Sequence, residues 1–278
     1  MCTLPYSSDL SDAEWAILRP LLTRARQAGH RQVLDLRRIV EAVFYPLRTG
    51  CQWRGIPHEF PPWPAVYWHY AKWRRAGTWE AINAALRERQ RIALGRAAQP
   101  TAAIIDSQSV RTTEAGGPRG YDGGKKVTGR KRHVMVDTQG NLLKVRVHPA
   151  DLHDRRGAEV LLQGLAAQFP LIALIWADTA YRGLTDWLAS TLGWKLSIVK
   201  HWWTGLQGVW VGPGQLPPEV PQGFHVLPRR WVVERTFAWI SRNRRMAKDY
   251  EHLMQTGEML TYMAMSRVML RRLAKATT

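Results

Sequence analysis

The fold is decided by two runs of sequence, Lys131-Arg132-His133-Val134-Met135-Val136-Asp137 and Leu142-Leu143-Lys144-Val145-Arg146-Val147-His148, which flank the turn Gln139-Gly140-Asn141. Two such runs joined by a short glycine-containing turn predict a β-hairpin. Upstream, the apolar run from Ala102 to Ile105 predicts a short buried strand that leads into Asp106. These segments predict that the second part of the chain is built on a sheet.

Helices and strands alternate after the hairpin. The predicted helices cover about residues 154–168, 184–191, 231–248 and 256–274, and the predicted strands cover 171–177 and 195–200. Residues 201–224 are rich in Gly, Pro and Trp and predict an inserted loop. This order predicts an α/β domain over residues 98–278, with a mixed sheet and helices on its faces.

Residues 1–97 predict helices only. Short helices with tight turns resemble a helix-turn-helix arrangement, so we expect an all-α DNA-binding domain here. The helix boundaries rest on local signals: the capping box of Ser11 and Glu14, the caps Asp35 and Gly50, Pro64 in a first turn, and Thr78 as the cap of a fourth helix.

The chain is strongly basic. Its 278 residues include 40 Lys and Arg against 22 Asp and Glu, a net charge of +18 that divides into +7 for residues 1–99 and +11 for the remainder. Such a surplus destabilises a compact state and favours a polyanionic partner. Nucleic acid is the favoured partner, and an anionic membrane surface is the alternative.

Other features narrow the class of protein. The sequence contains no run of 18 apolar residues, so we expect no membrane span. The first residues lack the pattern of a signal peptide. Cys2 and Cys51 have neither metal-ligand nor disulfide spacing. These features are typical of a protein in a reducing cytosol.

Three carboxylates occupy informative places. Asp106 lies in the first predicted strand, Asp178 ends a later strand, and Glu234 lies on a long helix. Taken singly, a strand-end Asp usually caps a turn and a helical Glu is usually solvated. As a set in a basic protein, they favour a shared divalent cation such as Mg²⁺, which prefers oxygen ligands. Two such ions can activate a nucleophile and stabilise the leaving oxygen of a phosphodiester.

Two basic segments are candidates for DNA contact. The third predicted helix, from about Pro64 to Gly77, mixes aromatic and basic residues. Alternatively, its aromatic residues belong to the core and its cations are only solvated. The other segment follows the glycine-rich residues 116–124 and enters the strands that bear the carboxylates, so we favour phosphate contacts over simple solvation. The candidate residues are Lys72, Arg74, Arg75, Lys125, Lys126, Arg130, Lys131 and Arg132.

Some polar residues have simpler interpretations. Asp137 is predicted to stabilise the hairpin turn. Asp154 is predicted to cap a helix, with a supporting role near the metal site as the alternative. His133 and His148 lie on strands, and neither has a partner at ligand spacing.

Several motifs resemble one family. They are Ser8-Asp9-Leu10-Ser11-Asp12-Ala13-Glu14-Trp15, Leu47-Arg48-Thr49-Gly50-Cys51-Gln52-Trp53-Arg54, Ile105-Asp106-Ser107-Gln108-Ser109-Val110, Gly129-Arg130-Lys131-Arg132-His133, Trp176-Ala177-Asp178 and Arg229-Arg230-Trp231-Val232-Val233-Glu234-Arg235-Thr236-Phe237-Ala238-Trp239. Over about residues 6–274 the chain resembles bacterial insertion-sequence transposases of the DDE type, most closely the group named insertion sequence five. The resemblance implies an RNase H-like catalytic fold, dependence on Mg²⁺ with Mn²⁺ as a substitute, and Asp106, Asp178 and Glu234 as the catalytic, metal-binding triad.

The chain departs from the family around its glutamate. Related transposases often carry a tyrosine, an arginine and a lysine spaced around this residue. Arg230 matches the arginine, which implies a contact with DNA, but Leu227 and Ser241 occupy the tyrosine and lysine positions. This departure concerns the contacts with the transposon end and not the triad.

The resemblance implies a function. The protein would bind the terminal inverted repeats of its element, cut this double-stranded DNA and join it to target DNA, so we expect it in the bacterial cytoplasm, associated with the nucleoid. Because two ends must be joined, we expect a homodimer on DNA. Two alternatives stay open: a metal-dependent nuclease that does not join, and a DNA-binding regulator with a decayed catalytic half.

Overall fold

A computed structural model describes residues 6–23, 34–200 and 228–276 of the chain. The predicted inserted loop at 201–224 lies outside the described residues. The described sheet contains β1 (Ala102–Arg111), β2 (Gly120–Asp122), β3 (Val127–Asp137), β4 (Leu142–Pro149), β5 (Leu174–Ala177) and β6 (Lys195–Ile198).

The sheet is mixed. Its order is β2-β3-β1-β5-β6, with β4 also paired to β3. The strands β1, β3 and β4 are antiparallel neighbours, whereas β5 and β6 run parallel to β1. The predicted hairpin is confirmed as β3 and β4. Strand β1 continues past Asp106 to Arg111, further than predicted, because β3 pairs with it along its whole second half.

Alternate side chains on the strands face two separate cores. On one face, Ile104 and Val134 join a core shared with helices from both ends of the chain. On the other face, Ile105 and Met135 pack beneath the helices that connect β4 to β6. This period of two is the pattern of a sheet buried on both sides.

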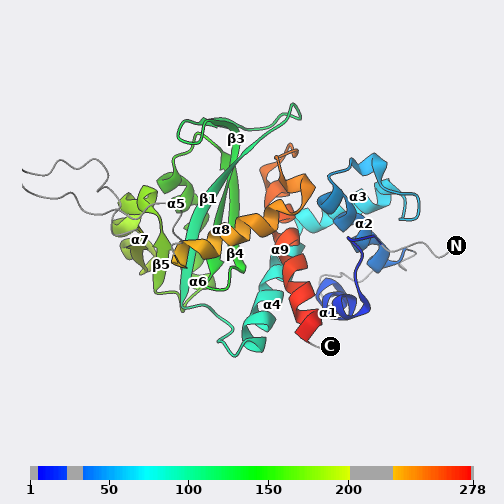
Figure 1. Ribbon diagram of the computed structural model, residues 1–278, viewed down its shortest axis with the longest axis horizontal. Coiled ribbons are helices and arrows are strands. Elements are labelled where there is room, and N and C mark those ends of the chain that lie inside the picture. Colours follow the sequence, from blue (N-terminus) through cyan, green and yellow to red (C-terminus); the bar gives the residue numbers. More distant parts are fainter. Residues whose placement is uncertain (1–5, 24–33, 201–227, 277–278) are drawn as a thin grey trace, which may run out of the picture.

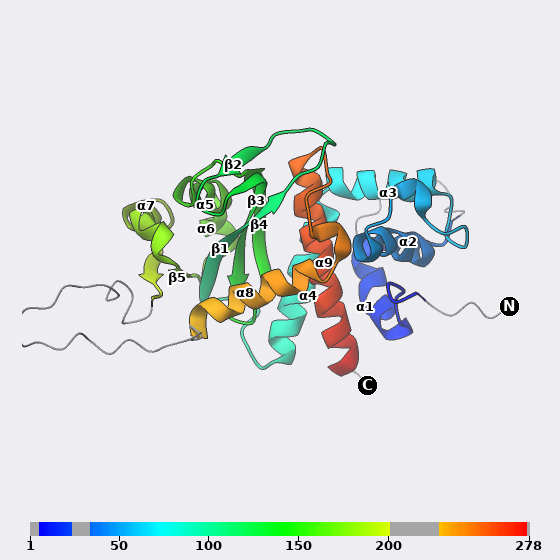
Figure 2. The ribbon, with the colours of Figure 1, turned by 45° about the horizontal axis from the view of Figure 1, so that its top comes forward.

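Helices cover both faces (Figures 1 and 2). One face carries α5 (Asp154–Leu162), α6 (Leu165–Gln168), the 3-10 helix η2 (Thr179–Leu184) and α7 (Thr185–Leu192). The other carries α4 (Thr78–Ala93), α8 (Pro228–Ser241) and α9 (Met254–Ala276). The helix predicted over 154–168 is interrupted at Gly164, whose φ is 75°. The helix predicted over 231–248 ends at Ser241, and the 3-10 helix η3 (Arg244–Met246) follows it.

The N-terminal helices begin and end close to the predicted positions. They are α1 (Asp12–Thr23), α2 (Leu36–Thr49), the 3-10 helix η1 (Trp53–Gly55), α3 (Trp63–Arg75) and α4. The capping box is confirmed, since the Ser11 amide donates to Glu14 Oε2 at 2.8 Å and the Glu14 amide donates to Ser11 Oγ at 3.2 Å. Asp35 and Gly50 cap α2 as predicted. Thr78 is the first residue of α4, and the cap is Gly77.

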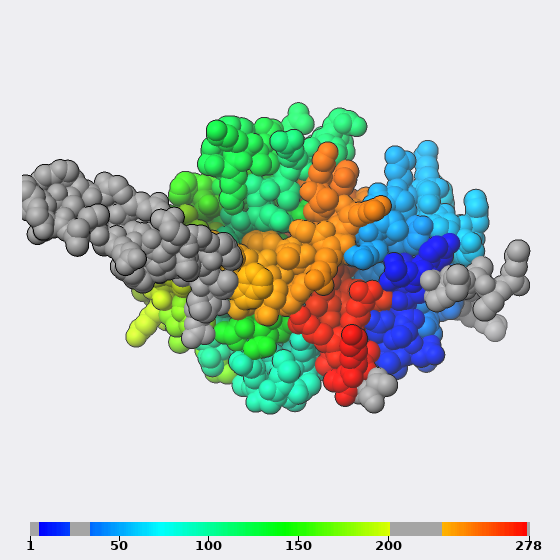
Figure 3. Space-filling model, in the orientation of Figure 1, coloured from blue at the N-terminus to red at the C-terminus, as the bar shows by residue number. Residues whose placement is uncertain are grey.

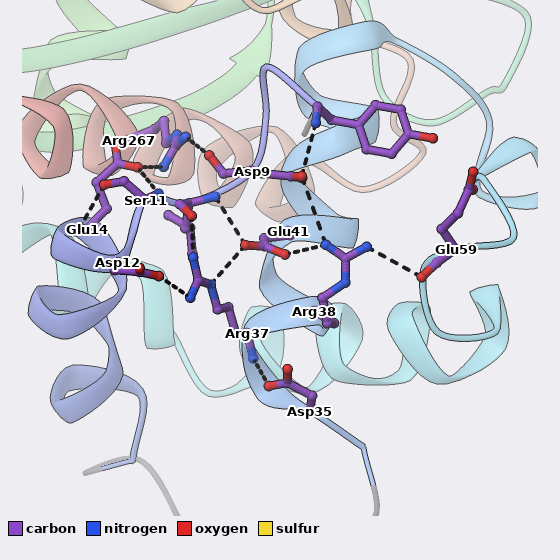
Figure 4. A network of polar contacts seen from close by, with 12 residues as sticks. Asp9, Ser11, Asp12, Glu14, Asp35, Arg37, Arg38, Glu41, Glu59 and Arg267 are labelled. Carbon is purple, nitrogen blue, oxygen red and sulfur yellow. Dashed lines mark hydrogen bonds and ion pairs between the residues drawn. The ribbon is translucent and has the colours of Figure 1, made fainter. Parts of the chain in front are cut away.

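The C-terminal helix α9 binds the N-terminal helices to the sheet. Figure 4 shows Arg267 of α9 beside Glu14, and Arg37 of α2 between Asp12 and Glu41. One hydrophobic core contains residues of α1, α2, α4, α9 and the strands. The predicted boundary near residue 97 falls between α4 and β1, and this core extends across it.

Within the described ranges, no helix combines the length and the apolar character needed to cross a bilayer.

Candidate active site

The parallel pairing of β1 and β5 brings two of the predicted carboxylates together. Ile104 is paired with Trp176, and Asp106 and Asp178 each lie two residues further along their strands. Because residues two apart on a strand share a face, both aspartates face the side of the sheet that α8 covers. Asp178 also caps η2, its Oδ1 accepting a hydrogen bond of 2.9 Å from the Ala180 amide.

The third carboxylate reaches this place from α8, which crosses the sheet (Figure 1). Thr236 fixes the helix against the β3–β4 turn, since its Oγ1 donates to Gly140 O at 2.9 Å. Arg235 donates to Gln139 O in the same turn at 3.1 Å. These contacts hold Glu234 and, one helical turn earlier, Arg230 over the sheet.

The three carboxylates converge on one guanidinium. Arg230 Nη2 lies 3.9 Å from Asp106 Oδ2, 3.8 Å from Asp178 Oδ2 and 3.7 Å from Glu234 Oε1. The structure therefore brings together the four residues that the sequence singled out from distant segments. A cation at this point reduces the mutual repulsion of the carboxylates.

The three carboxylates differ in exposure. The exposed fraction of the side chain rises from 16% for Asp106 to 27% for Asp178 and 43% for Glu234. Burial raises the pKa of Asp106 to about 6, although the Ser107 backbone amide and Arg230 oppose this rise. The Asp106 carboxyl is thus costly to ionise, and an added cation would stabilise its charged form.

The donor set suits a hard divalent cation, because it consists of carboxylate oxygens alone. The present spacing suits the guanidinium: within the described ranges, no three His, Cys, Asp or Glu side chains are grouped closely enough to hold a metal ion. Mg²⁺ binds oxygen at about 2.0–2.1 Å. Binding it here would require Arg230 to withdraw and the carboxylates to move inward.

Three of the predicted DNA contacts are wrong. Arg130, Lys131 and Arg132 have exposed fractions of 0, 5 and 1%. Arg130 binds Asp249, Lys131 binds Asp154, and Arg132 donates to the Met246 and Lys248 carbonyls. These cations are buried because the segment after α8 and the first residue of α5 supply their partners.

The other predicted DNA contacts lie at the surface or near it. Lys125 and Lys126 are exposed after β2, although Lys125 Nζ also donates to Ser107 O at 2.9 Å. On α3, Lys72 is exposed over the Trp68 ring, and Arg75 is exposed. Arg74, the remaining candidate on this helix, is half-buried and donates to Thr256 Oγ1 at 3.0 Å. Their contact with DNA stays a prediction.

Sequence reasoning missed a polar cluster behind Asp106. His133, His148 and Tyr181 form one buried chain of hydrogen bonds. Asp154 does not cap α5 as predicted, because His153 is the N-cap. The Asp154 carboxylate instead accepts from Ser107 Oγ and binds Lys131 Nζ. The local sequence carries no signal for this cluster, because the strand register that pairs Ser107 with His133 and the packing of η2 bring its members together.

Two family models and one curated relative match parts of the chain. The family model described as "Transposase DDE domain" matches residues 97–269, and "Putative transposase of IS4/5 family (DUF4096)" matches residues 10–83. The chain is similar to the "Insertion element IS402 uncharacterized 16.2 kDa protein" of Burkholderia cepacia, with 30% identity over 118 residues that cover 38% of this chain and 76% of that protein. No solved structure matches the chain.

Proposed function

The chain belongs to the family of DDE transposases, and we propose that it binds the terminal inverted repeats of an insertion sequence, cleaves the DNA there and joins the freed ends to target DNA. The observation that carries this proposal is the convergence of Asp106, Asp178 and Glu234 on one cation-binding point. The surplus of basic residues over both parts of the chain supports a DNA substrate.

We assign an RNase H-like fold to the catalytic part. Three antiparallel strands, β4, β3 and β1, are followed by β5 and β6 parallel to β1, which is the strand order expected of that fold. Its active-site aspartates lie on β1 and at the end of β5, and its glutamate lies on α8.

Asp106, Asp178 and Glu234 would hold Mg²⁺, or Mn²⁺ in its place. Such an ion would polarise the phosphodiester and stabilise the developing charge on the leaving oxygen. The carboxylates fix its position, and the Ser107 amide orients Asp106. Arg230, released from the carboxylates, is placed to neutralise a phosphate. Water attacks phosphorus first, and the P–O3′ bond breaks to leave a 3′-hydroxyl at the element end and a 5′-phosphate on the other fragment. That hydroxyl then attacks a phosphodiester of the target strand and displaces its 3′ oxygen as a new 3′-hydroxyl, so no covalent protein–DNA intermediate is needed.

DNA binding would involve both parts of the chain. On the face shown in Figure 3, α8 and the segment after it (orange) lie between the strands (green) and the N-terminal helices (blue). Exposed Lys125 and Lys126, which follow β2, and exposed Lys72 and Arg75 of α3 supply positive charge to the two parts. We assign end recognition to the helix-turn-helix-like N-terminal helices. Pairing two ends would require a homodimer, acting on the bacterial nucleoid in the cytoplasm.

The test is incubation of the protein with end-bearing DNA in Mg²⁺ or in EDTA, with products mapped to the nucleotide. We expect cleavage at the element ends and strand-transfer products in Mg²⁺ only. Asp106→Ala should abolish both while leaving DNA binding largely intact. The control Asp186→Ala removes an exposed carboxylate on α7 and should retain activity.

Other outcomes of this experiment would contradict the proposed function or the assigned site. Cleavage without joined products would make the protein a metal-dependent nuclease. Specific binding and repression, unchanged in Asp106→Ala and without any cleavage by the wild type, would make it a DNA-binding regulator. Full cleavage by Asp106→Ala would overturn the assigned site.

A further inference from the structure

A chain of buried polar side chains lies on the opposite face of the sheet, behind Asp106. Tyr181 Oη lies 2.7 Å from His133 Nε2, His133 Nδ1 lies 3.0 Å from His148 Nε2, and His148 Nδ1 lies 2.9 Å from the Pro149 carbonyl oxygen. All three side chains are buried, with exposed fractions of 5% or less. They come from η2, β3 and β4, which are far apart in sequence.

The direction of these hydrogen bonds follows from the last acceptor. The Pro149 carbonyl can only accept, so His148 Nδ1 carries the proton and, in the neutral ring, His148 Nε2 accepts. His133 Nδ1 must then donate, which leaves His133 Nε2 as an acceptor. The Tyr181 hydroxyl therefore donates to His133, and its orientation is set by the whole chain.

The surroundings keep both imidazoles neutral and immobile. Burial, and then the neighbouring His148, lowers the pKa of His133 to about 3, and burial lowers the pKa of His148. Helix α5 closes over the pair at Gly157, where a Cβ atom would lie 2.5 Å from His133 Nδ1 and 2.6 Å from His148 Nε2. The backbone of α5 therefore lies close against both rings and restricts their rotation.

The chain of hydrogen bonds links the segments that carry Asp106 and Asp178, at a point where β1 and β5 are no longer paired. The pairing of β1 with β5 ends at Ile104 and Trp176, so Asp178 lies beyond the last pair. Tyr181 follows Asp178 by three residues, and its partner His133 is paired with Ser107, the neighbour of Asp106. The Tyr181–His133 hydrogen bond thus closes a short loop from Asp178 back to Asp106.

We propose that Tyr181 is a positioning residue: its hydroxyl, oriented by His133 and His148, holds Asp178 beside Asp106 so that the two carboxylates bind metal together. This inference rests on the proposed function, since it concerns the metal site assigned there. Residues that orient metal ligands from outside typically change metal affinity by about 10–100-fold when replaced.

The experiment measures Mn²⁺ binding to the DNA-free protein by calorimetry. Tyr181→Phe removes the hydroxyl and keeps the ring, and we expect the Kd for Mn²⁺ to rise about tenfold. Cleavage of end-bearing DNA should fall at low Mn²⁺ and recover at high Mn²⁺. Tyr70→Phe is the matched control, because Tyr70 is also buried and its hydroxyl has no hydrogen-bond partner among the described residues. It should bind Mn²⁺ like the wild type.

A second pair of variants tests the direction of the hydrogen bonds. His148→Gln retains an acceptor for His133 Nδ1 and should keep metal affinity near that of the wild type. His148→Leu removes the acceptor and should weaken Mn²⁺ binding as Tyr181→Phe does. Circular dichroism checks that each variant is folded. The pair also keeps the proposal testable if Tyr181→Phe does not fold.

The outcomes separate this inference from the proposed function. If Asp178→Ala loses Mn²⁺ binding while Tyr181→Phe and His148→Leu both bind as tightly as the wild type, the positioning role is wrong and the metal site stands. If Asp178→Ala binds Mn²⁺ like the wild type, the metal site itself is wrong, and the inference is overturned with it.

Discussion

At the scale of single residues, Arg230 controls the charge balance of the candidate active site. Its Nη2 atom lies 3.7–3.9 Å from one oxygen of each of three carboxylates. Opposite unit charges at about 4 Å attract by about 4 kcal/mol near a protein surface, where the effective dielectric constant is about 20. Arg230 therefore occupies, in electrostatic terms, the place that a divalent cation would take.

Arg230→Gln should strengthen Mn²⁺ binding to the DNA-free protein, by roughly tenfold, because the ion no longer displaces a bound guanidinium. Isothermal titration calorimetry measures this affinity. Arg89→Gln removes an exposed charge from α4 and serves as the control for net charge. An unchanged or weaker affinity in Arg230→Gln would contradict the competition between guanidinium and metal.

Asp106→Asn should stabilise the metal-free protein at pH 8. Burial raises the pKa of Asp106 to about 6, so the folded state binds this proton more tightly than the unfolded state does. The ionised side chain therefore destabilises the fold above about pH 6, by at most roughly 3 kcal/mol, and has no such effect below about pH 4. Thermal denaturation in EDTA at pH 8 and pH 4 checks this. A lower Tm for the variant at pH 8 would contradict the prediction.

At the scale of elements, the contact between α8 and the β3–β4 turn sets the position of Glu234. Gly140 adopts a φ of 81°, and a Cβ atom there would lie 2.9 Å from Thr236 Oγ1. Glycine is needed at this point for two reasons: the backbone is left-handed, and the helix passes close to the turn. The turn thus links the hairpin that organises the sheet to the helix that carries the third carboxylate.

Gly140→Ala should lower the free energy of unfolding by about 2–3 kcal/mol and reduce cleavage, because both backbone strain and the displacement of α8 contribute. Gly164→Ala is the matched control, since Gly164 has a φ of 75° and open space around it, so strain alone operates there. Urea denaturation and cleavage assays measure the two effects. Equal losses in the two variants would show that the close approach of α8 does not matter.

At the scale of the whole molecule, α9 joins the N-terminal helices to the catalytic sheet. Arg267 Nη1 of α9 lies 2.8 Å from Glu14 Oε2 of α1, and both side chains are largely buried. Asn83 of α4 donates to the Tyr262 carbonyl of α9 at 3.4 Å. A single core extends from α1 to the strands, so the helical part and the catalytic part support each other.

We expect the protein to unfold in one cooperative transition. Unfolding monitored by tryptophan fluorescence and by far-ultraviolet circular dichroism should give coincident curves. Arg267→Ala leaves the Glu14 carboxylate buried without this partner and should shift both curves together, by about 3 kcal/mol. Two separate transitions, with only one of them moved by Arg267→Ala, would show that the two parts fold independently.

Local sequence determined where several elements of this protein begin and end. The capping box at Ser11, the glycine that ends α2 at position 50, and the hairpin turn at Gly140 act between residues close together in the chain, so their spacing can be read directly. The family resemblance named Asp106, Asp178 and Glu234, and the parallel register of β1 and β5 explains how two of them meet.

Only the tertiary structure decided which charges are free. Arg130 and Arg132 belong to a basic run that predicted DNA contact, yet most of their partners come from residues 246–252, more than a hundred positions away. The Tyr181–His133 hydrogen bond and the convergence on Arg230 also join distant segments. Burial and pairing depend on which elements pack together, and a charge pattern along the chain does not contain that information.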